Sequence, residues 1–155
     1  MSAINEADIH SFVDAISIYF QQITREKAEI RAAYLVEGDI LPTTFELTGY
    51  ITVTGSFSGK VYFSASRGMV SHLLLMMHDT DHSEPRLLDA VGEIANTISG
   101  NARKHFGESM EISVPTTQTT GHGWLDKVVS PHSYVVLIKW KQYRASVVVD
   151  IQSNI

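Results

Sequence analysis

A carboxylate and a carboxamide at helical spacing are the side chains in this sequence best suited to chemistry. Glu93 and Asn96 follow Asp89, and at about 100° per residue all three lie on one face of a helix, with Gly100 one turn further on. Asparagine cannot act as a base, but its amide both donates and accepts hydrogen bonds and can hold a water in a fixed direction. Positioning of this kind is most of what phosphoryl transfer requires.

The element that must carry these residues is a helix from Ser83 to Gly107. Serine can cap the first turn with its hydroxyl, Pro85 is tolerated there, and Gly107 offers a left-handed stop. An apolar stripe at helical spacing predicts the buried face, which consists of Leu87, Val91, Ile94, Ala95, Ile98, Ala102 and Phe106. The polar face that holds Glu93 is therefore expected to point away from the core.

This polar face contains residues that destabilise the helix, which an ordinary solvated face would not need. Asp89 and Glu93 are like charges at i,i+4, which destabilises a helix by a few tenths of a kcal/mol. Gly92 and Gly100 inside the helix cost roughly 1 kcal/mol each relative to alanine, and are tolerated where another backbone comes close. We expect Asp89, Gly92 and Gly100 to contact a partner around the Glu93/Asn96 pair; an unspecialised polar face is the alternative.

The motif D-x-x-x-E-x-x-N, present here as Asp89-Ala-Val-Gly-Glu93-Ile-Ala-Asn96, resembles the active-site signature of the CheC/CheX/FliY chemotaxis phosphatases. The single copy and the following Thr-Ile-Ser-Gly-Asn-Ala resemble CheX more than CheC, which usually carries two copies. The length of the chain and the order of its expected elements also fit a CheX-like protein. Pro115 is the candidate for a proline that the family has downstream of the asparagine.

The resemblance implies an aspartyl-phosphate phosphatase that acts on a phosphorylated CheY-type response regulator. In the family mechanism the asparagine orients the attacking water, and the glutamate pairs with a lysine of the regulator. The Mg2+ ion is bound by the regulator. Asn96 and Glu93 would take these two roles, with Asp89 in support. The resemblance also implies a homodimer joined through the sheet and no cofactor of the chain's own. A receiver-binding module in which Glu93 and Asn96 only contact the partner remains an alternative.

Composition narrows the function classes. With 155 residues the chain is expected to form one domain, 1–155. The net charge of -5, without a basic cluster, argues against nucleic-acid binding, and the lack of cysteine excludes disulfides and thiolate chemistry. The N-terminus lacks the blocks of a signal peptide and no apolar run could span a bilayer, so a cytoplasmic protein without a membrane partner is expected.

Hydrophobic periodicity predicts a single α+β domain. The CheC/CheX resemblance implies that its sheet is largely antiparallel and packed by long helices. The expected elements besides the long helix are a helix from Ser2 or Asn5 to about Ile23, a half-exposed strand over 27–37, a hairpin of 45–53 and 57–63 with a two-residue II′ turn at Gly55-Ser56, a short helix over 69–77 capped by Ser66, a strand over 110–114, and strands 134–140 and 143–151. The last two are continuously apolar, which predicts central positions in the sheet.

Histidines offer rival sites. The segment His78-Asp79-Thr80-Asp81-His82 could bind a divalent metal and support a metal-dependent hydrolase. The same residue types are ordinary between two helices, and no third ligand stands at a recognisable spacing, so we expect no metal site. His122 and His132 are interpreted as surface loop histidines, and His105 as a partly buried core residue.

Overall fold

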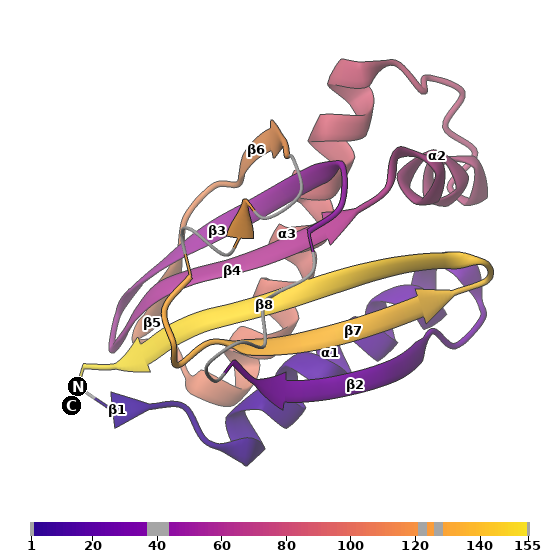
Figure 1. The fold of residues 1–155 in the computed structure, drawn as a ribbon. Coiled ribbons are helices and arrows are strands. Elements are labelled where there is room, and N and C mark those ends of the chain that lie inside the picture. The colour runs from indigo at the N-terminus through magenta and orange to yellow at the C-terminus, as the bar shows by residue number, and fades with distance from the viewer. Residues whose placement is uncertain (1, 37–43, 121–123, 126–128, 155) are drawn as a thin grey trace.

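The chain begins and ends in the same sheet (Figure 1). The computed structural model describes residues 2–36, 44–120, 124–125 and 129–154. Its elements in order are β1 (Ser2–Ala3), α1 (Glu6–Thr24), β2 (Glu29–Leu35), β3 (Leu47–Gly55), β4 (Phe57–Ala65), α2 (Arg67–Met76), α3 (Glu84–Phe106), β5 (Met110–Ile112), β6 (Thr116–Thr119), β7 (Tyr134–Trp140) and β8 (Tyr143–Ser153).

All strand pairs are antiparallel, and the sheet order is β2-β7-β8-β4-β3-β5. Strand β1 pairs with β8, and β6 pairs with β3 on the same edge as β5. The prediction of a single α+β domain with a largely antiparallel sheet is confirmed. Strands β7 and β8 lie inside the sheet, as their continuous apolarity predicted.

Helices α1 and α3 lie on one face of the sheet (Figure 1), where the main core forms. Alternation along a strand sends successive side chains to opposite faces. Phe63 and Val147 therefore belong to this main core, whereas their neighbours Tyr62 and Val148 belong to a smaller cluster with Leu125 on the other face. Both faces of the central strands are covered within the chain.

The helix starts follow the capping chemistry of the sequence in two cases out of three. The Asn5 side chain accepts from the Asp8 amide at 2.9 Å, and the Asp8 carboxylate accepts from the Asn5 amide, which completes a capping box. The Ser66 hydroxyl caps α2 by accepting from the Met69 amide. The predicted hydroxyl cap of Ser83 on α3 is wrong: its side chain makes no cap hydrogen bond, and its own amide donates to Asp81.

The β3–β4 hairpin is confirmed, but its two-residue turn is not. Val53 pairs with Gly59, so an odd number of residues separates the paired positions, whereas a two-residue turn needs an even number. Ser56 lies at the apex, where its amide donates to the Ser109 carbonyl at 3.0 Å and its carbonyl accepts from the Asn154 amide at 2.9 Å. Neighbouring segments therefore hold the turn in place of local turn chemistry.

The edge strand next to α3 also differs from the prediction. Strand β5 ends at Ile112, two residues before the expected end at Val114, and the Thr-rich segment that follows forms a further strand, β6. Polar threonines suit an edge strand because one side of it is solvated. In the described residues no helix is both long and apolar enough to cross a membrane.

Candidate functional site

Helix α3 is a rigid platform because it packs directly on the sheet. A Cβ atom placed at Gly49 of β3 would lie 2.6 Å from the carbonyl oxygen of Val91, so only glycine permits this approach of helix and strand. The apolar stripe from Leu87 to Ala102 is buried as predicted, although Phe106 is only partly buried. The orientation of every outward residue of α3 follows from this packing.

The predicted polar face points outward. Asp89 and Glu93 are exposed, with 61% of the Glu93 side chain accessible, and Asn96 and Gly100 are half-buried. An exposed Glu93 beside a half-buried Asn96 on one face of a packed helix is compatible with a docking surface, while their roles in chemistry stay predictions.

An open groove of about 540 Å³ runs beside this pair. One wall comes from α3, and the other from the segment that joins β5 to β6; the lining residues are Glu93, Asn96, Thr97, Ile112, Ser113, Val114 and Pro115. The two hydroxyls are already hydrogen-bonded to backbone carbonyls, Thr97 to Glu93 at 2.8 Å and Ser113 to Val114 at 2.8 Å. Among the described residues, no histidine or lysine that could activate these hydroxyls as nucleophiles lines the groove. The groove is thus suited to orienting a reactant supplied by another molecule.

The two glycines of α3 have different roles. A Cβ at Gly92 would lie 2.7 Å from the Thr117 side chain and 3.1 Å from Cβ of Pro115, so this buried glycine lets the chain's own edge strand pack on the helix. We therefore no longer place Gly92 among the residues that contact a partner. A Cβ at Gly100 would meet nothing within 4 Å, so internal packing does not require glycine there.

Arg86 is a residue of the site that the sequence interpretation missed. It lies two turns before Glu93 on the same face, and its guanidinium donates to the Glu93 carboxylate at 3.3 Å and to the Asp79 carboxylate at 2.8 Å. The hydrogen bond from Arg86 lowers the pKa of Asp79 below its usual value. The i,i+7 spacing of Arg86 and Glu93 was the available signal. Arg86 therefore offsets part of the negative charge of the Asp89/Glu93 pair.

The rival segment His78–His82 is a structural connector between α2 and α3. Both ring nitrogens of His82 are engaged, with the Ser71 hydroxyl at 2.6 Å and the Asp79 carbonyl at 2.8 Å. The Asp81 carboxylate accepts from the Ser83 amide at 3.0 Å. Within the described ranges, no three His, Asp or Glu residues are grouped so as to hold a metal ion.

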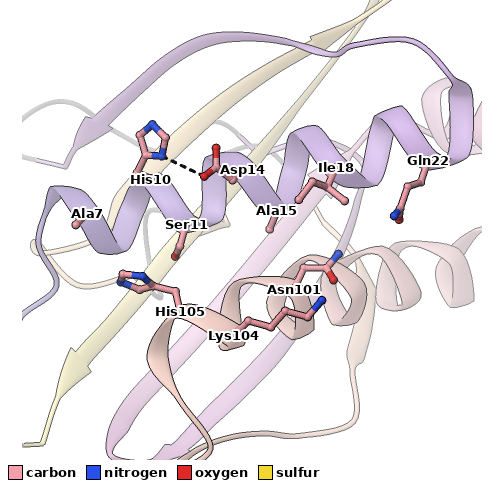
Figure 2. Close-up of a pocket in the computed structure, with 10 residues that line it drawn as sticks. All are labelled: Ala7, His10, Ser11, Asp14, Ala15, Ile18, Gln22, Asn101, Lys104 and His105. Atoms are coloured by element: carbon pink, nitrogen blue, oxygen red, sulfur yellow. Dashed lines mark hydrogen bonds and ion pairs between the residues drawn. The ribbon is translucent and has the colours of Figure 1, made fainter.

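The other histidines in the described part of the chain do not line the groove. His132 is exposed, and His122 falls outside the described residues. The prediction that His105 is a partly buried core residue is wrong: it is exposed and pairs with Asp8 of α1 at 2.8 Å, which lies near enough because α1 and α3 are adjacent. Figure 2 shows His105 with Lys104 across a wider hollow from His10 of α1.

This hollow between α1 and α3, about 700 Å³, is larger than the groove beside Glu93 but contains neither Glu93 nor Asn96 (Figure 2). Its charged residues are exposed, and His10 and Asp14 pair with each other at 3.3 Å along one turn of helix. Exposed pairs of this kind contribute little energy. We therefore place the candidate site at the smaller groove, where the motif residues lie.

The family model for the chemotaxis phosphatase CheX matches residues 47–139, which include α3 and the whole groove. The chain belongs to the CheX family. No curated protein sequence matches it. The matched region of this CheX-family chain contains every residue that we have assigned to the site.

Solved structures share the fold at low sequence identity. A CheC-like superfamily protein from Shewanella matches with a TM-score of 0.77 and 16% identity over 97% of this chain and 100% of its own. CheX from Vibrio vulnificus matches with a TM-score of 0.75 and 14% identity, covering 94% and 99%. CheX in a complex with CheY, BeF3 and Mg2+ from Borrelia burgdorferi matches with a TM-score of 0.69 and 17% identity, covering 94% and 97%. These CheX and CheC-like neighbours have the single α+β domain seen here.

Proposed function

We propose that this chain dephosphorylates the phosphoaspartate of a CheY-type response regulator by inserting Glu93 and Asn96 into the regulator's active site. The observation that carries the proposal is the open groove beside these two side chains on the packed helix α3. The CheX family is a phosphatase family, and the Borrelia CheX was crystallised with CheY, BeF3 and Mg2+, which supports a CheY-type partner.

Asn96 would act by orienting water. Its half-buried amide can donate to and accept from one water molecule at once, which directs a lone pair of that water at the phosphorus atom. The water oxygen forms a new bond to phosphorus as the bond from phosphorus to the aspartyl oxygen breaks. The products are inorganic phosphate and the free aspartate carboxylate. Alignment of the attacking and leaving oxygens is the contribution that this chemistry needs most.

Glu93 would hold the two proteins in register. Its exposed carboxylate can accept a charge-assisted hydrogen bond from a lysine of the regulator. Asp89, exposed one turn earlier, adds negative charge that favours the approach of this cation. The Mg2+ ion belongs to the regulator's phosphorylated site, where it would neutralise charge on the phosphoryl oxygens.

A dephosphorylation time course tests the proposal. Each purified response regulator of the source organism is phosphorylated in Mg2+, and the decay of the acyl phosphate is followed with and without this chain. We expect faster decay for at least one regulator at a substoichiometric amount of the chain. Binding to phosphorylated regulators without any faster decay would contradict catalysis and identify a receiver-binding module.

A further inference from the structure

The edge strand beside the groove contains one residue more than the strand it faces. Val53 pairs with Ile112, and Tyr50 pairs with Thr116, so Ile51 and Thr52 face the three residues 113–115. The Ser113 amide donates to the Thr52 carbonyl at 2.9 Å, and the Thr52 amide donates to the Ser113 hydroxyl at 2.9 Å. This arrangement is a β-bulge, a feature that re-aims a side chain at a sheet edge.

The side chain that the bulge re-aims is Val114. Regular alternation would place it on the same face as Ile112, which packs against the main core. Instead 83% of Val114 is exposed. Ile18 and Leu75 are the other large exposed hydrophobic residues in the described part of the chain, and both are less exposed than Val114. Of the three, only Val114 lines the groove with Glu93 and Asn96.

The backbone on both sides of the exposed valine is held in place. The Ser113 hydroxyl donates to the Val114 carbonyl at 2.8 Å. On the other side, the Pro115 ring lies against Gly92 of α3, where a Cβ would come within 3.1 Å of it. A β-branched side chain on a fixed backbone has few rotamers, so it loses little conformational entropy when a partner covers it.

We propose that Val114 is a specificity-determining contact of the docking surface. It seats against an apolar side chain that the receiver presents next to its phosphorylated aspartate. The inference rests on the proposed function, because the partner is the same receiver. Glu93 and Asn96 act on the polar centre of the interface, while Val114 selects receivers whose rim at this position is apolar. The residue affects affinity and leaves the chemistry to α3.

Binding measurements separate this contact from catalysis. The probe is the cognate receiver loaded with BeF3 and Mg2+ as a stable mimic of its phosphorylated form, and its dissociation constant is measured by calorimetry for wild type, Val114→Asp, Val114→Ile and Leu75→Asp. Leu75 is 60% exposed on α2 and does not line the groove, so it is the matched control for adding a charge at an exposed apolar position. Thermal melts verify that each variant is folded.

We expect Val114→Asp to raise the dissociation constant about tenfold or more, since it buries a carboxylate in an apolar contact. Val114→Ile and Leu75→Asp should stay within about twofold of wild type. In the dephosphorylation assay, Val114→Asp should raise KM while kcat stays near the wild-type value. Equal affinity of wild type and Val114→Asp would overturn the inference and leave the proposed function standing. A wild-type chain that binds no loaded receiver would overturn both.

Discussion

At the residue scale, Glu93 contacts one cation, its own Arg86, and in the proposed function it would meet a second, a lysine of the docked receiver. Arg86 stays anchored by its 2.8 Å contact to Asp79, whereas its contact to Glu93 is longer, at 3.3 Å. The longer contact is the weaker one, since hydrogen bonds lose strength with distance. Glu93 can therefore turn to a partner's cation while Arg86 remains in place.

Glu93→Ala should weaken docking with little effect on folding. The lost charge-assisted contact is expected to raise KM for the phosphorylated receiver about tenfold. Because the side chain is exposed, the free energy of unfolding should change by no more than roughly 0.5 kcal/mol. Asp89→Ala is the control that removes one negative charge from the same face, and its effect should be smaller. Steady-state kinetics with an unchanged KM for Glu93→Ala would contradict the assigned role.

At the element scale, the groove depends on how α3 packs between the sheet and its edge strand. Glycine removes the side chain at two places for different reasons. Gly92 admits Pro115 and Thr117 of the chain itself, whereas Gly100 leaves open space on the outward face. Substitutions at Gly92 therefore test packing within the chain, and substitutions at Gly100 test the open outward face.

Alanine at these two glycines should change stability in opposite directions. Gly100→Ala is expected to raise the free energy of unfolding by about 0.5–1 kcal/mol, because alanine is the better helix former and no clash arises. Gly92→Ala should lower it, because overpacking against Pro115 and Thr117 costs about 1–3 kcal/mol, more than the helical gain. Urea unfolding measures both, and stabilisation by Gly92→Ala would refute this description of the edge strand.

The connector between α2 and α3 should lose stability in acid. Arg86 lowers the folded-state pKa of Asp79 from 3.8. The contribution of the Asp79–Arg86 contact to the free energy of unfolding is therefore complete well above that value and is lost as the pH falls through the depressed pKa. Arg86→Gln should therefore reduce the loss of unfolding free energy as the pH falls from about 5 to about 2. Arg144→Gln, which removes an exposed cation from β8, is the control. If the free energy of unfolding depends on pH identically in Arg86→Gln and wild type, Arg86 does not lower the pKa of Asp79 as described.

The elements of the candidate site differ in how far the sequence predicts them. The stripe of α3 and the outward direction of Glu93 follow from helical periodicity, which is a local property. The bulge at Val114 does not, because the extra residue is defined only by pairing with β3, some sixty positions earlier. The predicted two-residue turn at Gly55-Ser56 is wrong for the same reason, since Ser109 and Asn154 hold the apex of the hairpin from distant parts of the chain.

At the scale of the whole molecule, the sheet has two unlike edges. Strands β5 and β6 form the edge beside α3 and the groove, and β2 forms the edge at the other end of the strand order. The chain itself covers both faces of the apolar strands β7 and β8, so these faces are not open to a second copy. We propose that a dimer forms by pairing of β2 edges, which leaves both grooves open.

Light scattering at micromolar concentration should give about twice the chain mass of 17.2 kDa. Ala33→Pro in β2 is the informative variant, because proline has no N–H to donate to a strand of the partner. It should shift the mass towards that of the single chain. A wild-type chain that is monomeric throughout the micromolar range would refute the dimer.

Asn96→Ala tests the central claim most directly. The variant removes the amide that orients water and leaves Glu93 and Val114 in place, so it should fold like wild type, bind the phosphorylated receiver, and fail to accelerate decay of its acyl phosphate. Decay is followed for the receiver alone, with wild type and with the variant, alongside thermal melts. A well-folded Asn96→Ala protein that dephosphorylates the receiver at the wild-type rate would contradict the account.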